Sequence, residues 1–175
     1  MKKLTRVLLL LTVTAVGTSG VKAEDGTIQF NGKIAEETCS VDMKSAAQSV
    51  VMGTISTDAI ISAGEVAAPT RFSILLNNCP DSVNRINVNF TGTADTANTS
   101  LISLSSDSSA AGVGIALYES DSTTLIPLRS DSAAVEINPE AGVNSLNYVA
   151  KYMATASRVT PGSANAVVDF TLGYK

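Results

Sequence analysis

The chain is mildly acidic and poor in the residues that most enzymes use. Its 175 residues include 12 Lys and Arg, 16 Asp and Glu and no His, so the formal net charge is −4. Without His and with only two Cys, the usual pairs of nucleophile and general base are absent, and an acidic chain does not bind nucleic acid by bulk electrostatics. We expect no catalytic residue, no metal site and no cofactor; carboxylates paired by folding remain the one open catalytic arrangement.

Residues 1–23 have the composition of a secretory signal peptide. Basic residues precede an apolar run over residues 7–16, and small and polar residues then lead to Ala23. The run is too short to cross a bilayer as a helix, although a membrane anchor is the rival interpretation. We expect cleavage after Ala23, and residues 15–17 offer a second site. The segment predicts that the protein is exported.

The chain that remains after this cleavage fits one domain with a hydrophobic core. Removal of 23 of the 175 residues leaves 152. Four of the 12 basic residues and none of the 16 acidic residues lie in the removed segment, so the formal net charge becomes −8. The exported domain is therefore expected to stay soluble through its charge.

Cys39 and Cys79 are the two cysteines of the chain. An exported protein with an even number of cysteines most simply joins them. A bond that closes a loop of about 40 residues would stabilise the fold by roughly 4 kcal/mol. A metal or redox site is disfavoured, because the chain has no CxxC motif, no His and no third sulfur ligand. We expect a structural disulfide.

The composition after residue 23 predicts an all-β fold. Val, Ile, Thr and Ser are frequent, and no stretch sustains helical periodicity beyond two turns. Short strands separated by turn residues are typical of a β-sandwich. The predicted strands are 27–34, 38–43, 49–55, 71–77, 85–91, 112–119, 124–128, 135–138, 145–155 and 164–174. The stretches 58–69 and 91–111 are predicted to be surface loops.

The last predicted strand is unusual, because its alternation runs to the penultimate residue. Alternate positions carry Ala166, Val168, Phe170, Leu172 and Tyr174, and only Lys175 follows. Chain ends commonly fray, so we expect this end to be held in a sheet. No hairpin follows to cover its outer edge, which makes that edge a candidate for pairing with another chain.

A second alternating stretch lies before the first cysteine. Its alternate positions carry Gly26, Ile28, Phe30, Gly32 and Ile34, with a gap in side-chain size at Gly32. One interpretation makes this stretch the first strand of its own sandwich. The other makes it a strand that enters the groove of a neighbouring molecule. The residues alone leave both interpretations open.

Five segments of the chain resemble the structural subunits of chaperone–usher fimbriae, close to type 1 pilins. They read GTIQFNGKIAEETCSVD around Cys39, FSILLNNCP around Cys79, GVGIALYES from Gly112, NYVAKYMAT, and VTPGSANAVVDFTLGYK at the end. The most specific is the last, with a glycine fourteenth from the end and a penultimate aromatic residue. The resemblance covers essentially the whole chain after residue 23.

The resemblance implies an incomplete immunoglobulin-like β-sandwich that lacks its last strand and is completed by donor-strand complementation. Residues 24–36 would be an N-terminal donor-strand extension and residues 37–175 the pilin domain. The implied donor residues are Gly26, Ile28, Phe30, Gly32 and Ile34, and the implied acceptor or chaperone-facing residues are Gly162, Val168, Phe170, Leu172 and Tyr174. The implied partners are a periplasmic pilus chaperone, an outer-membrane usher and neighbouring pilin subunits in a fimbria on the bacterial cell surface.

Two alternatives stay open at this point. One is a minor, adaptor or rod-terminating pilin of the same system, since the segment before Ile28 is short if cleavage follows Ala23. The other is a self-contained exported β-sandwich that binds a carbohydrate or another small ligand, although the chain has no Trp for stacking on sugars.

Overall fold

The computed structural model describes residues 28–32 and 38–175, which belong to two units of the chain. Residues 28–32 contain neither helix nor strand. The expected signal peptide, residues 1–23, lies outside the described residues, as do Gly26 and Ile34. Among the described residues, no helix is long and apolar enough to span a membrane.

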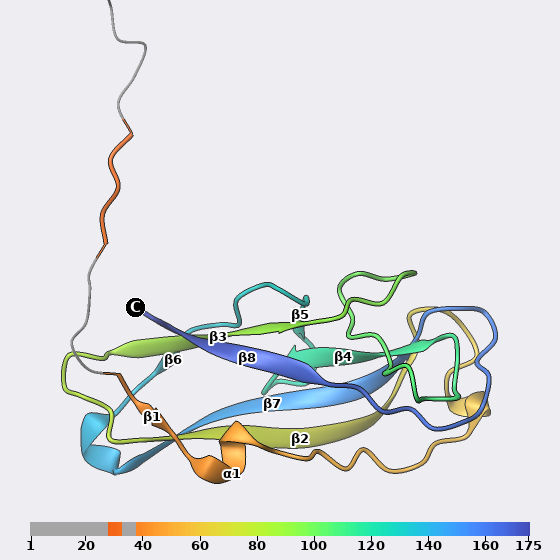
Figure 1. Ribbon diagram of the computed structural model, residues 1–175, viewed down its shortest axis with the longest axis horizontal. Helices are drawn as coiled ribbons and strands as arrows, with labels where there is room; N and C mark the ends of the chain where they lie inside the picture. Colours follow the sequence, from red (N-terminus) through yellow and green to blue (C-terminus); the bar gives the residue numbers. More distant parts are fainter. Residues whose placement is uncertain (1–27, 33–37) are drawn as a thin grey trace, which may run out of the picture. The chain divides into compact units, whose positions relative to one another are not determined.

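Residues 38–175 form two antiparallel β-sheets, in agreement with the all-β prediction (Figure 1). In spatial order, the first sheet contains β1 (Ser40–Val41), β2 (Val66–Asn77), β7 (Val143–Ala154), β4 (Val113–Glu119) and β5 (Leu125–Ile126). The second contains β6 (Val135–Glu136), β3 (Arg85–Gly92) and β8 (Val168–Tyr174). The short helical elements are α1 (Met43–Ala46), η1 (Thr57–Ala59) and η2 (Pro139–Ala141).

The core lies between the two sheets and is built from the alternating rows that the sequence predicts. The buried positions are Ile86, Val88 and Phe90 on β3, Val113, Ile115 and Leu117 on β4, and Leu146, Tyr148, Ala150 and Tyr152 on β7. At the centre, the Tyr148 ring lies 5.2 Å from that of Phe90 and 5.7 Å from that of Phe72, measured between centroids. Aromatic contacts of this kind add to the stabilisation that comes from burial alone.

The predicted disulfide is confirmed, because Cys39 and Cys79 are bonded to each other. The bond joins the start of β1 to the turn after β2. It supports β1, which pairs with β2 only through Ser40 and Val41.

The prediction of a strand over residues 49–55 is wrong. The chain there is extended, but within residues 38–175 no backbone hydrogen bond joins it to a neighbouring strand. Gly53 adopts a positive φ of 73°, which interrupts the alternation after Met52. A strand needs a hydrogen-bonded neighbour, and alternation alone does not reveal whether one is present.

The prediction of a loop over residues 58–69 is wrong at its end, because β2 begins at Val66. The register against β7 shifts between Ala67 and Thr70, and Ala68 has a positive φ of 53°. Together with Pro69, which has no N–H to donate, this bulge breaks the period of two and hides the start of the strand from pattern analysis.

The last strand is shorter than the predicted range 164–174, since β8 begins at Val168. The residues just before β8 instead hydrogen-bond to the loop before β4. The Ser105 N–H donates to the Asn165 carbonyl at 2.7 Å, and the Ala110 N–H donates to the Ser163 carbonyl at 3.0 Å. The chain therefore stays extended before β8 but lies outside both sheets.

Removal of the disulfide tests how much it stabilises this fold. We expect the double substitution Cys39→Ser with Cys79→Ser to lower the free energy of unfolding by about 4 kcal/mol, because the unfolded chain regains the entropy of an open loop. Urea unfolding followed by circular dichroism measures the change. An unaltered midpoint would contradict the stabilising role of the bond.

A candidate strand-accepting groove

The last strand, β8, lies at the edge of its sheet. Its inward side chains stand opposite β3 in a continuous antiparallel register: Val168 faces Gly92, Phe170 faces Phe90, Leu172 faces Val88 and Tyr174 faces Ile86. No described strand pairs with the other side of β8. An edge strand leaves alternate backbone N–H and C=O groups without a partner, so β8 presents an open hydrogen-bonding edge.

The side chains of β8 are covered less well than those of its neighbour. The inward residues of β3, from Ile86 to Phe90, are at most 1% exposed. The four inward residues of β8 pack against the same core but are only half-buried, whereas Asp169 and Thr171 between them are exposed. The alternation predicted for this strand is confirmed. The side chains on its inner face remain partly exposed to solvent.

The opposite side of the gap is formed by the extended chain between α1 and η1. Val50, Met52 and Ile55 are half-buried here, and the Gly53 carbonyl accepts a hydrogen bond from the Tyr152 hydroxyl at 3.4 Å. In Figure 1 this extended chain runs on the side of the gap opposite β8. The hollow beside this chain is bordered on its other side by residues 164–166, which directly precede β8, and no residue of β8 itself lines it.

Two adjoining cavities of about 520 and 680 Å³ occupy this gap. Both are lined by residues 53–54 on one side, by Ala164 and Asn165 on the other, and by Tyr152 on the floor. Further floor residues of the second cavity are Phe72, Ile102, Ile115, Leu117 and Ala150. We call this continuous hollow the groove.

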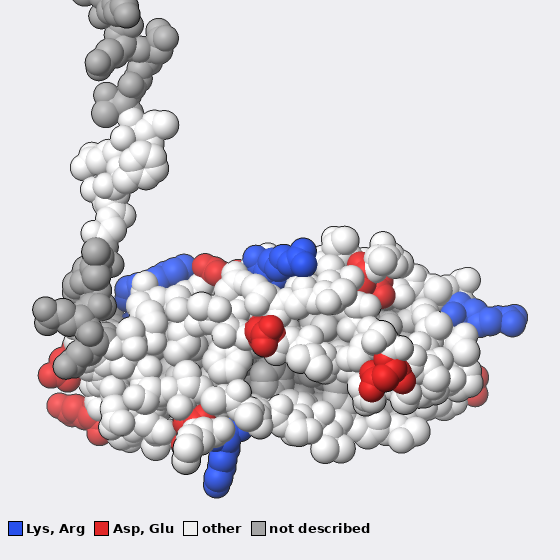
Figure 2. Space-filling view, in the orientation of Figure 1, with Lys and Arg blue, Asp and Glu red and all other residues white. Residues whose placement is uncertain are grey.

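The groove suits an uncharged, extended ligand. Among the described residues, none of the side chains that line the two cavities is charged. Figure 2 shows that the charged side chains on this face are few and lie apart from one another. Apolar walls beside an open strand edge are what an added β-strand requires, since the edge supplies main-chain hydrogen bonds and the pockets receive alternate side chains.

The groove carries no recognisable chemistry for a metal or a reaction. Within residues 28–32 and 38–175, no three or more Cys, Asp or Glu side chains gather as a metal site. Its polar lining consists of Ser, Thr, Asn, Gln and Tyr side chains. These groups can donate and accept hydrogen bonds, and so the groove can bind a peptide backbone.

The described residues of the predicted donor stretch are strongly exposed. The side chain of Ile28 is 80% exposed and that of Phe30 is 90% exposed. A Cβ placed on Gly32 would meet nothing within 4 Å. Neither of the two large apolar side chains is therefore buried.

Gly162 lines the first cavity of the groove. The structure shows why this position is a glycine, which the sequence alone did not explain. A Cβ at this position would lie 2.5 Å from the Ala110 nitrogen and 2.6 Å from the Ser109 carbonyl carbon. Only glycine therefore lets the chain approach the loop before β4 this closely. Gly173 is similarly constrained, because a Cβ there would overlap the side-chain amide of Asn87.

The sequence did not reveal the wall opposite β8 or most of the floor. In the segment 49–55, Val50 and Met52 are apolar residues on alternate positions. This pattern is equally typical of a strand that is paired in the core, so it does not identify a groove wall. Phe72, Ile102 and Tyr152 come from distant parts of the chain, so only the fold brings them into one groove.

Substitution of Gly162 tests the close approach. We expect Gly162→Ala to destabilise the fold by about 1–3 kcal/mol, because the added methyl group meets backbone atoms that cannot rotate away. Gly32→Ala is the matched control and should leave the free energy of unfolding nearly unchanged, since its Cβ has open space. Equal unfolding midpoints for the two variants in urea would contradict the geometry.

Comparison with known proteins assigns the chain to a family. Residues 28–175 match the family model described as "Fimbrial protein". The probable major fimbrial subunit LpfA of Escherichia coli O157:H7 is 34% identical, over 100% of this chain and 98% of that protein. The type-1 fimbrial protein A chain of Salmonella typhi is 38% identical, over 89% of this chain and 85% of that protein.

Solved structures agree with this assignment. A Burkholderia pseudomallei antigen and type I fimbria protein is 35% identical, with a TM-score of 0.61 over 85% of this chain and 97% of that chain. The P pilus rod subunit PapA is 25% identical, with a TM-score of 0.65 over 79% of this chain and 100% of that chain. The chain, with its immunoglobulin-like sandwich and open groove, belongs to the fimbrial protein family.

Proposed function

We propose that this fimbrial subunit polymerises by donor-strand exchange, in which the groove of one copy receives an extended strand from another molecule. The observation that carries the proposal is the half-buried inner row of β8 beside an uncharged groove and an open backbone edge. An added strand would cover that row and pair with the open edge in one step.

The donor that we propose is the face of Gly26, Ile28, Phe30, Gly32 and Ile34 in a neighbouring subunit. In an extended strand these five residues span about 26 Å and all point to the same side. Burial of Ile28, Phe30 and Ile34 would each contribute on the order of 1.5 to 3 kcal/mol before the cost of ordering the strand. Gly32 would lie where the groove leaves no room for a side chain.

The chain organisation follows from this mechanism. Residues 1–23 would direct export and be removed, residues 24–36 would form the donor extension, and residues 37–175 would form the pilin domain. A periplasmic chaperone would fill the groove first, and exchange for the donor strand would take place at an outer-membrane usher. The product is a fimbria on the cell surface that supports adhesion.

A repeating structural subunit is favoured over a minor or adaptor subunit. Support comes from the relatives, one of which is named a probable major fimbrial subunit and another a rod subunit. A self-contained sugar-binding sandwich is disfavoured, because three of the four Tyr residues, Tyr118, Tyr148 and Tyr152, are buried. Copy number per fibre, measured by quantitative mass spectrometry of sheared fimbriae, separates the first two functions, since one copy per fibre excludes a rod subunit.

Strand uptake can be measured directly with a peptide of residues 24–36. We expect the peptide to bind the full chain after cleavage and to raise its melting temperature, because it supplies the missing neighbour of β8. Calorimetry and thermal unfolding with increasing peptide give the affinity and the shift. A melting temperature that stays unchanged at saturating peptide concentration would mean that the sandwich is already complete.

The fit at Gly32 gives a second prediction. We expect Gly32→Leu to slow or block polymerisation, because a branched side chain would enter the shallow part of the groove. Asn31→Leu is the matched control, since residue 31 lies on the other face of the extended donor. The readout is fibre yield from cells, measured on sheared fimbriae by immunoblot. Normal yield from Gly32→Leu would exclude the proposed position of Gly32.

A further inference from the structure

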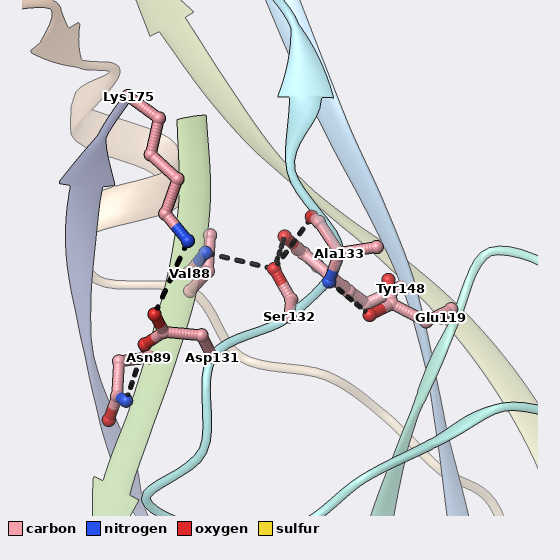
Figure 3. A network of polar contacts seen from close by, with 8 residues as sticks. All are labelled: Val88, Asn89, Glu119, Asp131, Ser132, Ala133, Tyr148 and Lys175. Carbon is pink, nitrogen blue, oxygen red and sulfur yellow. Dashed lines mark hydrogen bonds and ion pairs between the residues drawn. The ribbon is translucent and has the colours of Figure 1, made fainter. Parts of the chain in front are cut away.

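A short segment, residues 131–133, connects the two sheets along the side of β3 remote from β8. We call it the strap (Figure 3). Asp131 forms a bridge with Asn89 of β3, and the Ser132 N–H donates to the Val88 carbonyl at 2.8 Å. None of the three residues lines either cavity of the groove.

Ser132 ties β3 to the opposite sheet through its side chain. The buried hydroxyl accepts a hydrogen bond from the Val88 N–H at 2.9 Å and donates to the Ala133 carbonyl at 3.1 Å. The Tyr148 hydroxyl lies 3.2 Å from it and can donate to its remaining lone pair. Burial raises the pKa of Tyr148 to about 12, so this hydroxyl keeps its proton at neutral pH.

The neighbours of Ser132 extend the connection to both sheets. The Ala133 N–H donates to the Glu119 Oε1 atom at 2.6 Å, which anchors the strap to the end of β4. Asp131 accepts from the Asn89 Nδ2 atom at 2.9 Å, and its carboxylate lies 3.8 Å from the Lys175 Nζ atom. Hydrogen bonds from the side chains of β3 hold the pKa of Asp131 below its usual range, so the charge that faces Lys175 persists.

The strap is connected to the groove indirectly, through residues that it contacts. Tyr148, which the strap holds through Ser132, packs on Phe72, and Phe72 is part of the groove floor. Lys175, which the strap holds through Asp131, directly follows Tyr174 of the half-buried row. The strap thus acts on the groove floor through Tyr148 and on the end of β8 through Lys175, without lining either cavity.

We propose that the strap positions the two sheets for strand uptake, keeping the empty groove at the width and register that the incoming strand requires. This inference rests on the proposed function. An empty apolar groove would bury surface by closing, and polar contacts of fixed length between the sheets oppose that closure. A site held open beforehand binds faster, because no reorganisation precedes entry.

The test compares hydroxyl deletions that leave packing intact. Tyr148→Phe removes only the contact with Ser132 and keeps the ring. Ser132→Ala removes the same contact together with the hydrogen bonds of this hydroxyl to Val88 and Ala133. Tyr118→Phe is the matched control, because Tyr118 is a buried tyrosine that packs with Leu101 and Val149 and lines neither cavity. Each full chain after cleavage is mixed with a fluorescent peptide of residues 24–36 in stopped flow.

We expect Tyr148→Phe to associate about three- to tenfold more slowly, the range for loss of one hydrogen bond, with dissociation close to that of the unaltered chain. Ser132→Ala should be slowed at least as much, because it also leaves the Val88 N–H without its acceptor. The melting temperature of the peptide-filled Tyr148→Phe variant should change little, and Tyr118→Phe should match the unaltered chain throughout.

Two results would overturn the inference while leaving the proposed function intact. One is unaltered association in both strap variants. The other is a slower association of Tyr148→Phe matched by an equal loss of stability in its filled form, which would reduce the strap to a general stabiliser. Absence of binding by the unaltered chain would instead overturn the proposed function, and the inference with it.

Discussion

A β-strand with one neighbour has satisfied only half of its backbone, and this constraint governs the structure around β8. The strand is held by β3 through seven consecutive residue pairs, and its inner side chains reach the core. What it lacks is the strand that would finish its cover. The uncharged walls, the unpaired chain before η1 and the aromatic floor are all features that suit an added strand at this position.

The groove discriminates by shape and backbone more than by charge. Its lining offers apolar surface and neutral polar groups, so an extended apolar strand gains both burial and a hydrogen-bond ladder. A charged strand would gain little from burial, and a helical segment could not form the hydrogen-bond ladder. Alternate residues with one gap in size, as at Ile28, Phe30 and Gly32, provide a pattern that such a groove can distinguish in register.

The sequence reveals those parts of the fold that follow a strict period of two. The rows on β3, β4 and β8 were predictable for this reason, and so was the disulfide, because the two cysteines had no other partner. The bulge at Ala68 and the turn at Gly53 break the period, so the start of β2 and the unpaired state of residues 49–55 were not predictable. The groove floor was hidden because Phe72, Ile102 and Tyr152 meet only through tertiary contacts. The close approach of Gly162 to Ser109 has the same origin.

The disulfide has a mechanical consequence for a chain that links to its neighbours. Tension applied to the chain ahead of residue 38 arrives first at β1, which has only two residue pairs with β2. Such a short strand would peel away under a modest load. Because Cys39 is bonded to Cys79, the load passes instead through covalent bonds to the turn that leads into β3, and β3 carries the whole length of β8. The force therefore enters the sandwich at the strand that pairs with β8, and bypasses the two-residue pairing of β1.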